Sequence, residues 1–245
     1  MTNFPIPAPL FDGHCRTVEA GNAFDWYRQG WAIFVVNPGV WIAMTVILIV
    51  IFMGLHIVPL VGWLVAHLLT PVLAAGMLLA CRKAADGETL TIGDLFAGFR
   101  RNSHALVMLG VWYMAGVALV SLLIFILAGG GVAGALALGN PLGAGIAIGG
   151  FFVAGVLWML LSVPVAMAIW FAPALVFFND MPPLQALQAS FNACLKNILA
   201  LLVYGLIGLI LSFFAALPVG LGFLVLGPVM AGSIYASYRD IFVTA

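Results

Sequence analysis

Six continuous apolar runs dominate the chain, separated by tight turns or short polar stretches. A helix that crosses a bilayer needs about 20 mostly apolar residues, and each run is close to that length or longer. Because apolar residues follow one another without alternating with polar ones, the runs predict membrane-spanning helices and not strands. The fourth run is too long for one straight span, and Pro164 and Pro173 interrupt it. The runs cover residues 39–57, 60–81, 104–128, 146–178, 197–217 and 219–238.

Three short amphipathic segments, at residues 26–37, 92–102 and 184–196, precede the first, third and fifth runs. Their apolar residues recur at spacings of three and four, which is typical of a helix with one apolar face. They are too short and too polar to span, so they predict helices that lie in the cytoplasmic membrane interface. We expect a sharp bend at Asn37-Pro38, since proline disfavours helical geometry in the residue before it.

The order of these segments repeats along the chain: an interfacial helix, a span, a turn and a returning span. Pro71 and Pro228 occupy matching places in the second and sixth runs, and an arginine follows eleven residues after each, at Arg82 and Arg239. The sequence therefore predicts an all-α polytopic membrane helical bundle of six transmembrane helices in three pseudo-repeated hairpins, each preceded by an interfacial amphipathic helix. Residues 1–21 are expected to form a polar cytoplasmic arm, and residues 22–245 a single membrane domain with units at about 22–83, 91–180 and 182–240.

The composition agrees with a membrane protein and excludes other classes. Apolar residues make up 65% of the chain and charged residues 7%, whereas a soluble domain carries about 25% charged residues. A soluble enzyme is therefore excluded. Eight Lys and Arg against eight Asp and Glu leave no basic field for nucleic acid. Three cysteines without a paired spacing give neither a disulfide framework nor a zinc site.

The charged residues lie in four places, namely the N-terminal residues up to Arg28, residues 82–101, residues 180–196 and the pair Arg239-Asp240. With six crossings all four fall on one side of the membrane. The short stretch 82–101 carries four basic residues, which predicts the cytoplasmic side, with both termini inside. The Gly-rich stretch 129–145 then becomes an outer loop, to which we assign no role.

Two sequence strings resemble a known family. They are GWAIFVVNPGVW at residues 30–41 and LFAGFRRN at residues 95–102. Together with the prolines at positions 59 and 71, they are similar to a family of uncharacterised proteobacterial inner-membrane proteins, the BPSS-type multi-pass transmembrane proteins. The resemblance covers the chain from about residue 21 onward. It implies a bacterial inner membrane and this helical architecture, and it implies no catalytic residues.

His67 is the candidate functional residue, because it is the only histidine well inside a predicted span. It lies about seven residues into the second run, roughly 10 Å below the outer boundary at 1.5 Å per residue. Intramembrane ionisable groups commonly serve function, but a packed imidazole can also hydrogen-bond to a neighbouring helix. Ser162, Ser212 and Tyr204 are possible partners for such a bond. Two further histidines, His56 and His104, lie at span ends and at different depths from His67, so we expect no shared metal or haem.

We identify no catalytic, cofactor-binding or metal-binding residues, and we expect no enzymatic activity. Four basic residues, Arg82, Lys83, Arg100 and Arg101, are candidate contacts for anionic lipid. The preferred function is a structural, lipid-associated or partner-scaffolding protein of the bacterial inner membrane. Expected partners are membrane lipids and either a membrane protein or further copies of the chain, but no nucleic acid. The alternative is a small-solute channel or carrier whose pathway runs between the hairpins near His67.

Overall fold

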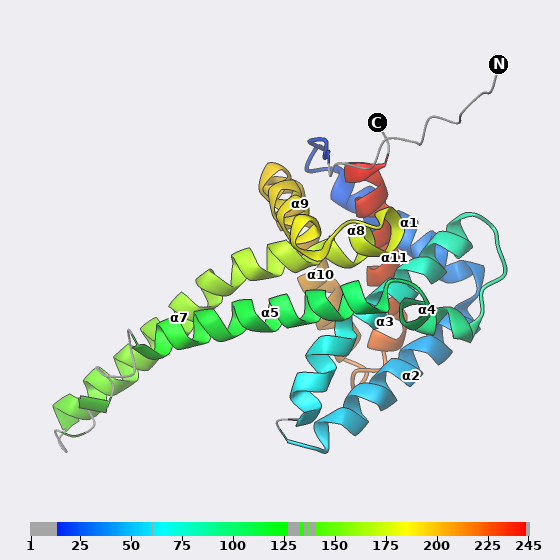
Figure 1. The fold of residues 1–245 in the computed structure, drawn as a ribbon. Coiled ribbons are helices and arrows are strands. Elements are labelled where there is room, and N and C mark those ends of the chain that lie inside the picture. Colours follow the sequence, from blue (N-terminus) through cyan, green and yellow to red (C-terminus); the bar gives the residue numbers. More distant parts are fainter. Residues whose placement is uncertain (1–13, 60, 127–132, 135–136, 138–140, 244–245) are drawn as a thin grey trace.

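The computed structural model describes residues 14–59, 61–126, 133–134, 137 and 141–243, and the elements assigned within these ranges are helices. Most of the expected outer loop at 129–145 and of the N-terminal arm lies outside them. Figure 1 shows the arrangement. The elements are α1 (Asn22–Val36), α2 (Pro38–His56), α3 (Val61–Ala85), the 3-10 helix η1 (Ile92–Phe96), α4 (Ala97–Arg100), α5 (Ser103–Ile124), α7 (Pro141–Trp170), α8 (Ala172–Asn179), α9 (Pro183–Lys196), α10 (Ile198–Ala216) and α11 (Phe223–Phe242).

Among the described residues, five helical stretches are long and apolar enough to cross a membrane: α2, α3, α5, α10 and the stretch Gly145–Asn179, which contains most of α7 and all of α8. The sixth expected span corresponds to α11, which is not one of the five. Its C-terminal half is too polar, because it carries Arg239 and Asp240. The all-helical membrane fold is confirmed, and six spans in three hairpins stay a prediction.

Helix α3 is the central span. Just over half of its most apolar window is buried inside the protein, 56%, whereas the other four windows are only 6 to 22% buried. Figure 1 shows α5 and α7 side by side, projecting well beyond the other helices, while α2 and α3 form a hairpin that diverges from them. The low burial of α2, α5, α10 and the stretch Gly145–Asn179 leaves most of their apolar surface exposed, as expected of helices that lipid surrounds.

The short helices meet at the opposite end of the molecule, which we call the hub. The hub comprises α1, η1, α4, α8, α9 and the C-terminal half of α11 (Figure 1). Helix α1 packs mainly on α11, η1 and α4 pack on α3, and α9 packs on α7 and α8. Each short helix therefore rests on the returning helix of a hairpin unit. Because the first short helix rests on the last unit, the three units close into a ring.

An asparagine breaks the backbone between each short helix and the span that follows. Asn37 separates α1 from α2, as expected for the residue before a proline, and Asn197 separates α9 from α10. Asn102 precedes α5 in the left-handed region, with φ of 57°. Its side-chain amide donates to the Val176 carbonyl at 2.9 Å, whereas the side-chain oxygen of Asn197 accepts from the Val18 N–H at 2.8 Å. Each of the three short segments is thus followed by a break at an asparagine, and the threefold repeat itself stays a prediction.

In two of the three contacts between a short helix and a long helix, a glycine of the short helix lies against the long helix. A Cβ atom on Gly30 would lie 2.3 Å from the Val229 carbonyl oxygen, and one on Gly98 would lie 2.2 Å from the Val72 carbonyl oxygen. Val72 and Val229 directly follow the prolines that the sequence pairs, Pro71 and Pro228. The backbone of the short helix touches the same carbonyl in both units, which only glycine permits.

In the third contact, between α9 and α7, a serine hydroxyl takes the place of the glycine. Ser190 of α9 donates to the Met167 carbonyl at 2.8 Å and accepts from the Phe171 N–H at 2.9 Å. Phe171 is the point at which α7 ends and α8 begins, two residues before Pro173. The fourth apolar run is thus interrupted at Phe171, and α7 continues through Pro164.

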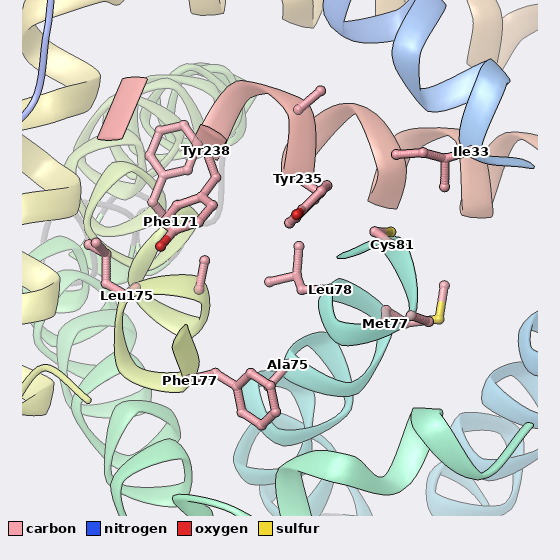
Figure 2. Close-up of a cluster of buried hydrophobic side chains, with 14 of the residues drawn as sticks. Ile33, Ala75, Met77, Leu78, Cys81, Phe171, Leu175, Phe177, Tyr235 and Tyr238 are labelled. Atoms are coloured by element: carbon pink, nitrogen blue, oxygen red, sulfur yellow. The ribbon is translucent and has the colours of Figure 1, made fainter. Parts of the chain in front are cut away.

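The hub holds a dense apolar core. Figure 2 shows Leu78 and Cys81 of α3 beside Tyr235 of α11, with Phe171 and Leu175 nearby. Phe171 and Leu175 are fully buried, as are the hub-side residues Trp26, Trp41, Met44, Leu95, Leu106 and Leu109. This packing fixes the hub ends of the long helices relative to one another.

Candidate functional site

His67 is half-buried on α3, and its hydrogen bond lies within its own helix. The imidazole Nδ1 is 2.8 Å from the carbonyl oxygen of Trp63, four residues earlier. A carbonyl only accepts, so Nδ1 carries the proton of this hydrogen bond, and in the tautomer with its single proton on Nδ1 the other nitrogen, Nε2, is an acceptor. Among the described residues, no hydrogen bond joins His67 to Ser162, Ser212 or Tyr204, the possible partners on neighbouring helices. Tyr204, one of the expected partners, instead pairs with Ser233, and the two hydroxyls lie 2.9 Å apart.

Two aromatic rings flank the imidazole. The Trp63 ring centroid is 4.4 Å from that of His67, at an interplanar angle of 47°. Tyr113 of α5 stacks on the imidazole as well, with a centroid distance of 5.9 Å and an angle of 13°. Trp63 reaches the imidazole because residues four apart on a helix are neighbours. Tyr113 reaches it because α5 approaches α3 closely at Gly110, where a Cβ would lie 2.8 Å from the Leu68 Cα.

These side chains line a hollow of about 290 Å³ between α3, α5 and α7, which we call the His67 hollow. Two groups from α7 complete its polar lining. Trp158 donates its indole N–H to the Ser121 hydroxyl at 3.3 Å, and Ser162 donates to the Met159 carbonyl at 2.8 Å. The described lining contains no charged side chain. It consists of Trp63, His67, Tyr113, Val117, Val120, Trp158, Ser162, Val165 and Ala166.

The His67 hollow can hydrogen-bond a ligand in two ways. The Tyr113 hydroxyl has no hydrogen-bond partner among the described residues, so its O–H is available to donate. Nε2 of His67 is available to accept. Ser162 shares the hollow with His67, as the sequence suggested, although no hydrogen bond joins them. The residues assembled here hold one imidazole and no carboxylate or thiolate, so they suit a neutral organic ligand better than a metal ion.

Two of the four basic candidates form ion pairs at the hub. Lys83 Nζ donates to Asp94 at 2.7 Å, and Arg101 donates to Asp180 at 3.0 Å. Burial alone would raise the pKa of the Asp94 carboxyl, but hydrogen bonds from Lys83 and Thr91 outweigh it and lower that pKa. The pKa of Asp180 is lowered mainly by the hydrogen bond from Asn102, and the Arg101 charge adds to this.

The other two basic candidates engage the protein without a described carboxylate partner. The Arg82 guanidinium lies over the Phe178 ring, 5.0 Å from its centroid, and Arg100 donates to the Gly93 carbonyl at 3.0 Å. All four side chains thus contribute to packing at the hub. Of the four, Arg82 and Arg100 form no ion pair with a carboxylate of the described residues.

The sequence analysis missed a polar cluster that we call the latch, which consists of Arg16, Asn22, Trp26 and Asp240. The Asp240 carboxylate accepts from the Asn22 amide at 2.9 Å and from the Trp26 indole at 2.8 Å, and it forms an ion pair with Arg16. The latch joins the start of the chain to the end of α11. No spacing rule could have identified partners 214 positions apart.

Helices of membrane-spanning length that converge on a packed hub define an all-helical integral membrane protein. The chain belongs to the family described as domain of unknown function DUF7847, whose family model matches residues 27–240. It is 33% identical over 234 residues to a probable inner membrane protein of Burkholderia thailandensis, an alignment that covers 89% of this chain and 82% of that protein. No solved structure matches the chain. The family membership confirms the resemblance inferred from residues 30–41 and 95–102.

Proposed function

We propose that the protein is a non-enzymatic component of the bacterial inner membrane that acts as a lipid-associated scaffold for membrane partners. The observation that carries this proposal is the packed hub, in which each short helix rests on a long helix of another part of the chain. Large side chains of the apolar core packed against the hub, among them Trp26, Trp41, Phe171 and Leu106, are at most 1% exposed. A solute crossing the membrane would have to displace this core, whereas a scaffold benefits from its rigidity.

The lipid-facing surface supplies the contact area that the proposal needs. Helix α7 presents Phe151, Phe152 and Leu160, and α10 presents Leu202 and Leu209, each more than half exposed. Bilayer lipid covers such faces, and a partner helix or a further copy of the chain can replace that lipid. The short helices of the hub lie at the interface in this arrangement, with Arg82 and Arg100 placed to attract anionic headgroups.

The orientation belongs to the same proposal: α11 crosses as the sixth span, and the hub and both termini lie in the cytoplasm. A reporter active only in the cytoplasm is therefore expected to be active when fused after Arg101, Asp180 or Ala245 and inactive within residues 129–145. The physical reason is the basic charge that the hub carries on short loops. An active fusion at Gly131 would overturn both the orientation and the six-span count.

A small-solute channel or carrier is the second candidate, and the His67 hollow is the observation that favours it. A hydrated path past the hollow would bring water to position 67, whereas a scaffold embedded in lipid would not. The two functions therefore predict different accessibility to water for the side chain at position 67.

The deciding experiment replaces His67 with cysteine after the three native cysteines have been changed to alanine. The scaffold proposal expects a water-soluble thiol reagent to label this cysteine in intact membranes at least about tenfold more slowly than one at Val58, because the reactive thiolate forms only where water solvates it. Val58 lies 52% exposed in the outer turn, and Leu206, 59% exposed on α10, provides the lipid-facing control. Labelling of Cys at position 67 as fast as at position 58 would contradict the scaffold and establish the carrier.

A further inference from the structure

We propose that the His67 hollow binds the head of a membrane-dissolved quinone. This inference is independent of the scaffold role, because it concerns a ligand that enters from lipid and requires neither transport nor catalysis. It rests on the composition of the lining, the state of its polar groups and its position between three spans.

The lining requires a neutral ligand. The described lining holds no charged side chain, and a bare ion among aromatic and valine side chains would lose its hydration without compensation. A phospholipid headgroup carries a phosphate, which would find no cationic side chain in the described lining. The ligand must therefore be soluble in the hydrocarbon region itself.

The lining also favours a flat ligand. Trp63, His67, Tyr113 and Trp158 contribute four planar rings, and the imidazole already stacks almost parallel to Tyr113, at 13°. Aromatic faces pack well against a planar ring, through offset stacking or edge contacts. An acyl chain, which is neither flat nor polar, would make no use of the rings and hydroxyls gathered here.

Two polar groups match the oxygens of a quinone head. The Tyr113 O–H, which has no partner within the described chain, can donate to a quinone carbonyl. His67 Nε2 accepts, because Nδ1 donates to the Trp63 carbonyl, so it can bind the O–H of the reduced form. The quinol thus gains one more hydrogen bond than the quinone.

The size of the hollow suits one substituted ring. Its volume of about 290 Å³ is at the lower end of the range for small-molecule sites. Val117, Val120 and Val165 complete the wall beside the polar groups, where the first carbons of an isoprenoid tail can pack. The rest of the tail would stay in lipid, because two of the three helices that form the site, α5 and α7, are mostly exposed.

The test uses the full-length protein in nanodiscs of phosphatidylethanolamine and phosphatidylglycerol, titrated with decylubiquinone. Quenching of tryptophan fluorescence reports binding, because Trp63 and Trp158 line the hollow. We expect saturable quenching by the wild-type protein. Tyr113→Phe, which keeps the ring, is expected to weaken quinone binding about tenfold, the usual effect of one lost hydrogen bond in a dry site. His56→Gln, at the end of α2 and outside the hollow, should bind as the wild type does.

A competition experiment tests the role of His67. Reduced decylubiquinone should displace the oxidised form from the wild-type protein, and His67→Leu should lose this preference for the quinol while still binding the quinone. Quenching that fails to saturate, or that is the same in wild type, Tyr113→Phe and His67→Leu, would show only partitioning into the bilayer and would overturn the proposal. Thermal midpoints of all variants, measured in the same nanodiscs, confirm that each is folded.

Discussion

Replacing Gly76 with alanine is expected to lower the free energy of unfolding by about 3 kcal/mol, the upper part of the range for overpacking a close contact. A Cβ on Gly76 would lie 1.9 Å from the Leu95 carbonyl oxygen, and one on Gly98 would lie 2.2 Å from the Val72 carbonyl oxygen. Both obstacles are backbone atoms, so no side chain can rotate away. The only relief is to move η1 and α4 off α3, which would open the ring at the hub. Unfolding by denaturing detergent in mixed micelles measures the change.

Two glycines on the spans provide matched controls. A Cβ atom added to Gly155 on α7 or to Gly205 on α10 would meet no neighbouring group within 4 Å, so Gly155→Ala and Gly205→Ala should be neutral or slightly stabilising. If Gly76→Ala unfolds at the same detergent fraction as these controls, η1 and α4 pack less closely on α3 than the structure describes.

Removing the Asp240 carboxylate of the latch is expected to produce the second large loss of unfolding free energy. Asp240→Ala leaves the Arg16 guanidinium, the Asn22 amide and the Trp26 indole without their common acceptor, and hydrogen bonds to a charged group contribute about 1.5–3 kcal/mol each. We expect a loss of about 3 kcal/mol in the same unfolding assay, because part of the cluster is reached by water. Asp240→Asn, which keeps an acceptor oxygen, should lose about half as much. A change below about 0.5 kcal/mol, the usual size for surface substitutions, would show that the latch does not hold α1 to α11.

The pH dependence gives an independent check on the latch. Burial alone would raise the pKa of Asp240, but the hydrogen bonds from Asn22, Trp26 and Arg16 outweigh it, so the pKa lies below its ordinary value of 3.8. The stabilisation is therefore present above that value and is lost as the pH falls through the lowered pKa. The thermal midpoint should be nearly constant from neutral pH to about pH 5 and should fall below about pH 4. In Asp240→Asn the fall should be smaller, since that variant no longer binds a proton at this site.

The helices and their breaks could be predicted from the sequence, because both are set locally. The length of each apolar run determines a span, and the break at Asn37 follows from Pro38. Thr91 and Asp94 cap η1 as their spacing predicts, with the Asp94 carboxylate accepting from the Thr91 N–H at 2.8 Å. Pro183 opens α9, at the position where its missing N–H costs nothing.

The hydrogen bond of His67 shows which contacts the local sequence can predict and which it cannot. Its real partner, the Trp63 carbonyl, lies four residues earlier and follows from helix geometry alone. The expected partners on other helices required knowledge of which spans are adjacent. Tyr204 pairs with Ser233 instead, and neither residue lines the hollow.

The sequence by itself determined that this is an all-helical membrane protein, because burial in lipid demands long apolar runs with every backbone bond made inside the helix. Only the tertiary structure decided which helix rests on which. The spans are apolar on nearly every face, so periodicity does not reveal the packed side, and association in lipid depends on close backbone approach at particular small residues. Gly30 against Val229 and Gly98 against Val72 close the ring in this way. The latch and the His67 hollow follow from that closure, since each joins residues that only the packed helices bring together.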